Sequence, residues 1–235
     1  MADFVLVHGG WIGAWCWRRV RPLLLAAGHQ VFTPTLTGLG HRAHLLTPDI
    51  DLSTHVQDVI AVIESEELQR VVLVGQSYAG MVITGVADHL AERLSQLVYL
   101  DAFVPEDGQS LADLVGPQMI ASLQQAARSA GDGWRVPPLP PQACGVREEQ
   151  DIRWMERRMG FHPLKTMLEP LHLTKQRCTV PKTFIYCNNP AIGFFESFVC
   201  KARAERWGFH ELATGHTAMV TAPAELTRVL LGITD

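Results

Sequence analysis

The stretch that decides the fold reads VVLVGQSYAG, residues 71–80. Four apolar residues typical of a buried strand run directly into a turn, and an apolar helical pattern continues from Met81. Ser77 stands at the corner, with the small residues Gly75 and Ala79 two positions away on either side. Such a turn exposes a serine hydroxyl at the carboxyl edge of a sheet, because small flanking residues let the two backbones approach. The stretch therefore predicts a nucleophilic serine, with an ordinary helix-capping serine as the alternative.

Apolar strands alternate with amphipathic helices on both sides of this stretch. Fully apolar strands must be covered on both faces, which is typical of a mainly parallel sheet in an α/β fold. We expect one helix to start near a Ser53 N-cap and to carry the apolar stripe Val56, Val59, Ile60 and Ile63. The expected strands are 4–7, 31–34, 71–74, 97–100, 183–187 and 208–212, and the other expected helices are 15–27, 195–206 and 223–231.

The middle of the chain has a different pattern. Between residues 105 and 180 no comparable strand is expected, while helical patches cover 111–128 and 148–159 and a proline-rich hinge covers 137–141. This organisation predicts an α/β core formed by residues 1–104 and 181–235. The segment 105–180 is predicted to be a helical cap inserted into that core.

Composition narrows the function classes. The 235 residues are 47% hydrophobic and 19% charged with a formal net charge of −4, which suits one domain and argues against a nucleic-acid partner. Its five cysteines lack CxxC spacing, so a disulfide scaffold or zinc cluster is not expected and a reducing compartment is favoured. No apolar run is long enough to span a membrane, and we expect no signal peptide. The predicted location is the cytoplasm.

A nucleophilic serine needs a base, and His216 is the best placed histidine. It follows the strand expected at 208–212 and precedes the last helix. The carboxyl ends of parallel strands share one edge, so His216 should lie near Ser77. The order of serine before histidine is also usual for a strand-to-helix nucleophile. The histidines expected at helix ends or within strands, and hence structural or on the surface, are His29, His89 and His210.

A glycine-rich turn after the first strand supplies a second expected feature. Residues 8–11 read HGGW, and this turn can present the backbone N–H of Gly10 toward the site. The backbone N–H of Tyr78, at the start of the next helix, would face the same point. The two N–H groups are therefore predicted to form an oxyanion hole, with a plain tight turn as the alternative for residues 8–11.

Two other motifs would indicate a metal site or a dinucleotide site, but the residues around them do not support either. His41 and His44 form an H-x-x-H pair, but no carboxylate or thiolate completes a metal-ligand pattern. Residues 38–43 match G-x-G-x-x-A, yet the following residues show no helix start to bind a pyrophosphate. We therefore expect no metal and no cofactor. A cofactor-dependent oxidoreductase stays open as an alternative that requires nicotinamide binding at residues 38–43.

Taken together, HGGW at 8–11, GQSYAG at 75–80 and GH at 215–216 resemble the α/β-hydrolase superfamily. More narrowly, they resemble small esterases related to plant methyl salicylate esterases and hydroxynitrile lyases, with bacterial relatives that cleave carboxylic esters, pyrethroids or carbamates. The resemblance covers nearly the whole chain, cap included. It implies an α/β-hydrolase fold and a serine esterase. The lyases carry a lysine where Thr217 stands and a threonine where Gly10 stands, so esterase is favoured over lyase.

A catalytic histidine also needs an acid that orients it, and at the position of this acid the sequence departs from the family pattern. In the plant relatives the acid follows the strand that corresponds to 183–187, where this sequence has Asn188-Asn189-Pro190. Some haloalkane dehalogenases instead carry the acid after the strand that follows the nucleophile helix, and Asp101 matches that place. We therefore predict Asp101 as the acid, with Glu196 as the second choice. The alternative for Asp101 is a carboxylate that caps a helix or anchors a loop.

The resulting hypothesis is two-step acyl transfer by Ser77, His216 and Asp101. The substrate would be a small apolar or aromatic ester, and carbamate cleavage would use the same machinery. A hydroxynitrile-lyase-like enzyme and a non-catalytic receptor for a small ligand remain alternatives on the same fold. A small-molecule ester is the expected partner, and a homodimer is left open. The residues predicted to line the pocket between the sheet edge and the cap are Trp11, Phe103, Trp134, Trp154 and Met155.

Overall fold

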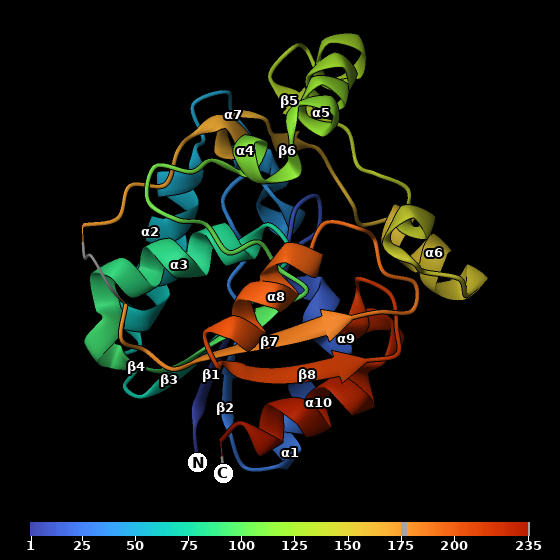
Figure 1. Cartoon of the computed structure of the whole chain (residues 1–235). Coiled ribbons are helices and arrows are strands. Elements are labelled where there is room, and N and C mark those ends of the chain that lie inside the picture. Colours follow the sequence, from blue (N-terminus) through green and yellow to red (C-terminus); the bar gives the residue numbers. More distant parts are fainter. Residues whose placement is uncertain (175–177, 235) are drawn as a thin grey trace.

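The computed structural model describes residues 1–174 and 178–234. Across these residues, six strands form one sheet in the order β2-β1-β3-β4-β7-β8, and every neighbouring pair is parallel (Figure 1). The predicted α/β-hydrolase architecture, a parallel sheet flanked by helices, is confirmed. The strands are β1 (Asp3–Val7), β2 (Gln30–Phe32), β3 (Val71–Gln76), β4 (Leu94–Leu100), β7 (Lys182–Cys187) and β8 (Gly208–Leu212).

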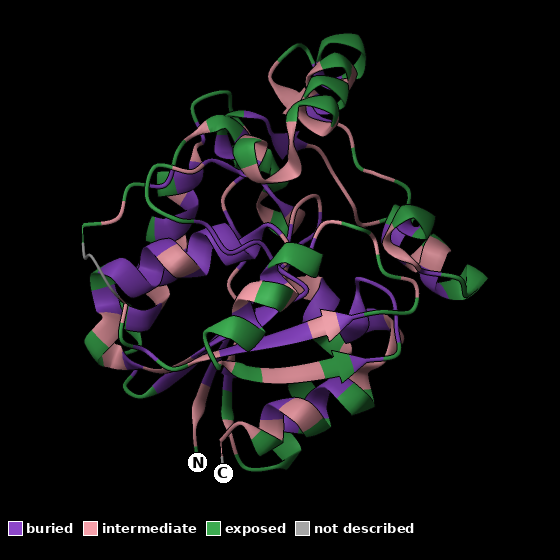
Figure 2. Ribbon diagram, viewed as in Figure 1, coloured by how far each residue is buried: buried purple, intermediate pink, exposed green. Residues whose placement is uncertain are grey.

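Helices cover both faces of the sheet (Figure 2), so β3 is buried along its whole length and β4 along most of it. Along β1, for example, Val5 and Val7 pack into one hydrophobic cluster while Phe4 and Leu6 pack into the other. The first face is covered by α2 (Leu52–Ser65), α3 (Ala79–Leu90) and α8 (Glu196–Ala204). The second face is covered by η1 (Ala14–Arg19), α1 (Arg21–Ala26), α9 (Ala218–Thr221) and α10 (Pro223–Gly232).

Two elements differ in detail from the sequence predictions. The helix expected over 15–27 is divided into η1 and α1, because Pro22 near the start of α1 has no N–H to continue the hydrogen bonds of the preceding turn. Helix α2 is capped by Asp51 and not by Ser53: the Asp51 carboxylate accepts from Thr54 N at 2.9 Å and from Thr54 Oγ1 at 2.7 Å. Strand β2, which is followed by Pro34, lies at the sheet edge, where a proline does not interrupt the pairing of central strands.

The segment between β4 and β7 forms short helices outside the layered core, drawn from green to orange in Figure 1. It also contains a two-stranded antiparallel pair that the sequence did not reveal, since each strand has two residues and shows no periodicity. The cap boundaries 105–180 stay a prediction. The elements of this segment are α4 (Leu111–Val115), α5 (Pro117–Ala130), β5 (Arg135–Val136), η4 (Pro141–Cys144), α6 (Glu149–Glu156), β6 (His162–Pro163) and α7 (Lys165–Leu168).

The topology determines which loops meet. Strand β3 lies inside the sheet between β1 and β4, and β7 and β8 follow on the β4 side. Because all six strands are parallel, the loops at their carboxyl ends share one edge. None of the helices in the described part of the chain is long and apolar enough to cross a bilayer.

Candidate active site

Ser77 occupies a strained corner between β3 and α3. Its φ angle is +57°, a left-handed conformation that costs a non-glycine residue roughly 1–2 kcal/mol. Three backbone hydrogen bonds hold the corner: Ser77 N donates to Leu100 O at 3.2 Å, and Ser77 O accepts from Gly80 N at 3.0 Å and Phe103 N at 3.2 Å. The conformation is therefore imposed by the surrounding chain.

The small residues around Ser77 are required by close backbone contacts. A Cβ at Gly75 would lie 2.7 Å from the Ala79 carbonyl oxygen, and a Cβ at Gly80 would lie 1.9 Å from the Phe103 carbonyl oxygen. Atoms cannot approach that closely without moving the backbone. The packing thus accounts for the glycines in the GQSYAG stretch.

His216 and Asp101 are hydrogen-bonded to each other in the interior. The distance from His216 Nδ1 to Asp101 Oδ2 is 2.7 Å, and the two side chains are 7% and 1% exposed. The other carboxylate oxygen, Oδ1, accepts from Cys187 N at 3.1 Å, and the Phe195 ring stacks on the imidazole with centroids 5.3 Å apart. Since a carboxylate only accepts, Nδ1 carries a proton and the neutral imidazole presents Nε2 as an acceptor. This is the arrangement of a base and its orienting acid.

Glu196, the second choice for the acid, lies elsewhere. It begins α8 at the surface, where its carboxylate accepts from the Tyr186 hydroxyl at 3.1 Å. Among the hydrogen bonds and ion pairs of the described residues, none joins Glu196 to His216. A carboxylate in the first turn of a helix is stabilised there by the helix dipole, which gives Glu196 a structural explanation.

Gln76, which was not predicted as a site residue, contacts the imidazole of His216 directly. Its side-chain Nε2 donates to both His216 Nε2 and His216 O, each at 3.1 Å, and the residue is 1% exposed. Donation to a carbonyl oxygen fixes the orientation of the amide, so a donor faces the acceptor nitrogen of the imidazole. Among the described residues, none forms a hydrogen bond with the Ser77 hydroxyl. In this structure the amide N–H of Gln76 therefore takes the acceptor lone pair of His216 Nε2.

The two backbone N–H groups predicted for the oxyanion hole are available. Among the described residues, neither Gly10 N nor Tyr78 N donates to a protein acceptor. The next N–H along, that of Trp11, is taken: it donates to His162 Nδ1 at 3.4 Å. Gly9 leaves room for the Gln76 side chain, since a Cβ at Gly9 would lie 2.4 Å from Gln76 Oε1.

Three buried histidines lie around these backbone groups. His55 Nδ1 lies 2.9 Å from the Tyr78 hydroxyl oxygen, and His8 Nε2 accepts from Leu36 N at 3.1 Å. Burial lowers the pKa of His8 and of His55 to about 4 and lowers that of His162 well below its usual range. The three imidazoles are therefore neutral at pH 7 and can act as hydrogen-bond acceptors inside the protein.

A largely apolar cavity of about 430 Å³ opens beside the triad. Ser77, Tyr78 and His216 contribute to its wall, as do the predicted lining residues Trp11 and Phe103. Apart from these five, the residues that line it are Leu111, Val115, Met119, Leu123, Leu139, Ala143, Cys144, Met167, Ile192, Phe194 and Phe195. Among these described residues none is charged. A smaller cavity of about 30 Å³ shares the Ser77 and His216 side of the site.

Of the other predicted lining residues, Met155 lines the smaller cavity, whereas Trp134 and Trp154 line neither. The Trp154 ring packs edge-on against Trp15, with centroids 4.9 Å apart, and the Arg19 guanidinium covers it at 5.3 Å. The Trp134 ring lies next to β5, beside the guanidinium of the residue that follows it. Both assignments are corrected: these aromatic rings pack against cations and not against the site.

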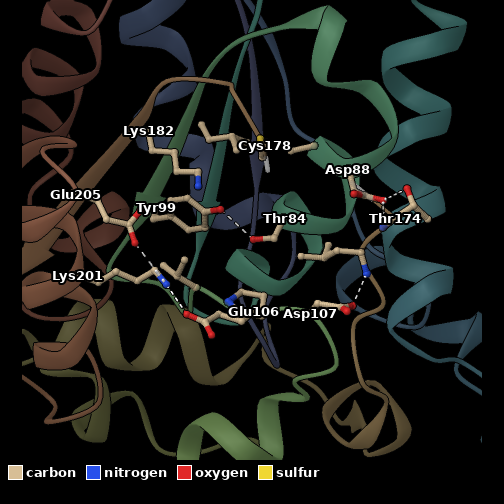
Figure 3. Close-up of a pocket in the computed structure, with 15 residues that line it drawn as sticks. Thr84, Asp88, Tyr99, Glu106, Asp107, Thr174, Cys178, Lys182, Lys201 and Glu205 are labelled. Carbon is tan, nitrogen blue, oxygen red and sulfur yellow. Dashed lines mark hydrogen bonds and ion pairs between the residues drawn. The ribbon is translucent and has the colours of Figure 1, made fainter. Parts of the chain in front are cut away.

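Another cavity, of about 410 Å³, lies away from the triad beside α3, β4 and α8 (Figure 3). Its polar groups are largely paired with one another. Lys201 Nζ lies 2.6 Å from Glu106 Oε1, and the hydroxyls of Thr84 and Tyr99 are 2.9 Å apart. Because neither Ser77 nor His216 lines it, this cavity is not the place of the triad chemistry.

The motifs set aside in the sequence have other structural explanations. His41 and His44 both lie in a short 3₁₀ helix, η2 (Gly40–Leu45), and His41 Nδ1 lies 3.2 Å from the Thr35 hydroxyl. Gly40 contacts Gly13 so closely that a Cβ on Gly40 would lie 2.9 Å from the Gly13 Cα. The glycine-rich stretch 38–43 thus packs against the turn that precedes η1.

The buried neutral histidines predict acid-dependent stability. The unfolded chain binds protons near pH 6.5, whereas folded His8 and His55 bind them at a pKa of about 4. The contribution of these two histidines to the free energy of unfolding is therefore fully present above pH 6.5. It falls as the pH decreases toward 4, by about 1.4 kcal/mol per pH unit for each histidine. Urea unfolding at about pH 7, 6 and 5 measures this slope. His55→Gln should reduce the slope, and the exposed His44→Gln should not; equal slopes in all three proteins would contradict the assignment.

Comparisons with known proteins agree with this fold. Residues 4–229 match the alpha/beta hydrolase family. A carbendazim-hydrolysing esterase of Nocardioides sp. (strain SG-4G) is 41% identical over 99% of this chain and 100% of that protein, and a polyneuridine aldehyde esterase of Rauvolfia serpentina is 27% identical over 99% and 95%. The solved structure of an extracellular alpha/beta-hydrolase from a Paenibacillus species has a TM-score of 0.86 at 24% identity, over 99% of this chain and 98% of that one. The chain therefore belongs to the alpha/beta hydrolase family.

Proposed function

We propose that this esterase hydrolyses small neutral esters by acyl transfer to Ser77, with His216 as the base and Asp101 as the acid that orients it. The observation that carries the proposal is the buried 2.7 Å hydrogen bond between His216 and Asp101, beside a cavity that Ser77 also lines. The esterase names of the two full-length relatives support the same reaction class.

The chemistry follows from the available donors and acceptors. His216 Nε2 takes the proton of the Ser77 hydroxyl while Oγ attacks the ester carbonyl carbon. The N–H groups of Gly10 and Tyr78 stabilise the resulting oxyanion, each by an amount on the order of 3 kcal/mol. His216 then gives its proton to the departing alcohol. Water attacks the acyl-enzyme with His216 again as the base, which releases the acid and restores Ser77.

Gln76 is assigned a positioning role in this cycle. In the resting state its amide N–H holds His216 through Nε2 and the backbone carbonyl. Nε2 has one lone pair, so the amide N–H must leave it before Nε2 can accept the proton of Ser77, while the second hydrogen bond to the His216 carbonyl can remain. Gln76 thus holds the imidazole in its neutral, acceptor form before the substrate reacts.

The lining of the large cavity defines the substrate class. Its wall is built from apolar side chains, and no charged residue is among its described lining residues. A charged acyl group would lose its hydration there without gaining a partner, so a neutral apolar or aromatic group is favoured. Carbamates present the same reactive carbonyl. The relative that hydrolyses carbendazim makes that compound the first carbamate to test.

We further propose that the reaction takes place in the cytoplasm. All five cysteines are free thiols, and Cys16 and Cys187 are buried. Unpaired cysteines are typical of proteins from reducing compartments.

Ser77→Ala tests the nucleophile. The variant should lose hydrolysis of p-nitrophenyl acetate, p-nitrophenyl butyrate and carbendazim by on the order of 10⁵-fold, because the proposed acyl-enzyme forms on the Ser77 hydroxyl. Release of p-nitrophenol and the disappearance of carbendazim are measured beside the parent protein. Undiminished turnover would refute the proposal. A parent protein that binds these compounds without turnover would instead be a receptor, and turnover of cyanohydrins without ester cleavage would indicate a lyase.

Asp101→Asn and Glu196→Gln form a matched pair for the acid. An amide at position 101 can donate to Nδ1 and so favours the wrong imidazole tautomer, which should lower kcat by on the order of 10³- to 10⁴-fold. The surface variant at position 196 should stay within about twofold of the parent. Steady-state kinetics compare the two, and a larger loss in Glu196→Gln would reverse the assignment.

Gln76→Leu tests the positioning role, with the exposed Gln57→Leu as the control. Without the amide, His216 loses the two hydrogen bonds that hold its position, so kcat should fall by about tenfold. KM should stay unchanged, since Gln76 does not line the large cavity. A parental kcat, or a change confined to KM, would show that Gln76 does not position the base.

A further inference from the structure

A small cavity lies directly against the proposed catalytic groups. Its volume is about 30 Å³, and its wall includes Gly10, Gln76, Ser77, His216 and Thr217. A cavity of this size holds a water molecule, whose share of liquid volume is about 30 Å³, if two or more polar groups face it. The wall supplies several, so the small cavity differs in kind from the apolar cavity beside it.

Thr217 lines this cavity and carries a buried hydroxyl that is unpaired among the described residues. The residue is 3% exposed, and its hydroxyl has no hydrogen-bond partner among the described residues. Its backbone is held firmly: Thr217 O accepts from Val220 N at 2.8 Å and from Thr221 N at 3.1 Å. A buried hydroxyl without a partner is costly, and native proteins rarely keep one unless a ligand, a water or the chemistry uses it.

We propose that Thr217 positions the water molecule that hydrolyses the acyl-enzyme; this inference rests on the serine-esterase function proposed above. Once the Gln76 amide has left Nε2, the water would donate one hydrogen to His216 Nε2 and the other to Thr217 Oγ1. Its oxygen lone pair then faces the acyl carbonyl carbon on Ser77. Thr217 directly follows His216, and both residues line the small cavity.

The step balances without any further reactant. The water oxygen forms a bond to the acyl carbon while His216 Nε2 takes a water proton. The oxyanion is held by the N–H groups of Gly10 and Tyr78. On collapse, the bond between the acyl carbon and Ser77 Oγ breaks, and His216 returns the proton to Oγ. The free acid and the original enzyme result, and Thr217 is unchanged.

The role is specific to one half of the cycle. In acylation the nucleophile is Ser77 itself, so the Thr217 hydroxyl is not needed to bring it to the carbonyl. In deacylation the nucleophile is a free water that must be immobilised and oriented. Loss of the hydroxyl should therefore slow deacylation and leave acylation intact, which a general structural role would not do.

Thr217→Val and Thr217→Ser test this. Valine keeps the shape and removes the hydroxyl, and serine restores the hydroxyl. Each protein is acylated with p-nitrophenyl butyrate, separated rapidly from excess ester, and followed by mass spectrometry as the butyryl group leaves. Thr217→Val should deacylate about tenfold more slowly than the parent, as expected for one lost hydrogen bond, and Thr217→Ser should recover most of the rate.

The rate of Ser77 labelling by a fluorophosphonate is the control. It needs the nucleophile, base and oxyanion hole but no water, so it should be within about twofold of the parent in both variants. Equal deacylation rates in parent and Thr217→Val would overturn the proposal. So would a parallel fall in labelling, which would place the hydroxyl in acylation or in the fold. A parent protein that is neither butyrylated nor labelled at Ser77 would refute the proposed serine-esterase function itself.

Discussion

The site depends on the left-handed backbone of Ser77, because the hydrogen bonds that enforce it also locate the acid. Ser77 N donates to Leu100 O and Ser77 O accepts from Phe103 N, so the two bonds bracket Asp101. Asp101 has a positive φ of 43° as well. The Ser77 corner after β3 and the Asp101 corner after β4 are therefore one hydrogen-bonded unit. His216 lies in the loop after β8, and its imidazole contacts this unit through the Asp101 carboxylate.

This coupling explains how an acid after β4 can replace one after β7. Asp101 N donates to Ile185 O at 2.7 Å, and Cys187 N donates to the Asp101 carboxylate. The carboxylate thus lies over the end of β7 although it belongs to β4. The segment after β7 carries Asn188, whose backbone N–H continues the pairing to Leu212 O at 3.1 Å. The Asp101 carboxylate therefore reaches His216 from a place at the end of β7.

Local patterns in the sequence were sufficient to predict the strands and to identify Ser77 and His216 as candidate site residues. Each depends on neighbouring residues: an apolar run, a small-residue turn, or a strand followed by G-H. Gln76 was missed because its partner is 140 residues away, and no periodicity announces such a contact. Trp154 was assigned to the pocket by residue type. In α6 the inward face carries Asp151 and Met155, four residues apart, and Trp154 points about 100° away from Met155.

The turn at residues 8–11 is contacted from the segment between β4 and β7 by a neutral imidazole, that of His162. The neutrality of this group has an electrostatic consequence. His162 Nδ1 accepts from Trp11 N, while its Nε2 lies 2.8 Å from Thr166 Oγ1. The Thr166 hydroxyl donates to Pro163 O, so it accepts from an Nε2 proton. A neutral imidazole thus joins an acceptor and a donor on opposite edges without net charge. A carboxylate could accept from Trp11 equally well, but its negative charge would repel an oxyanion forming at the neighbouring Gly10 N–H. Burial that keeps His162 neutral therefore both braces the turn and preserves the field in which the proposed transition state forms.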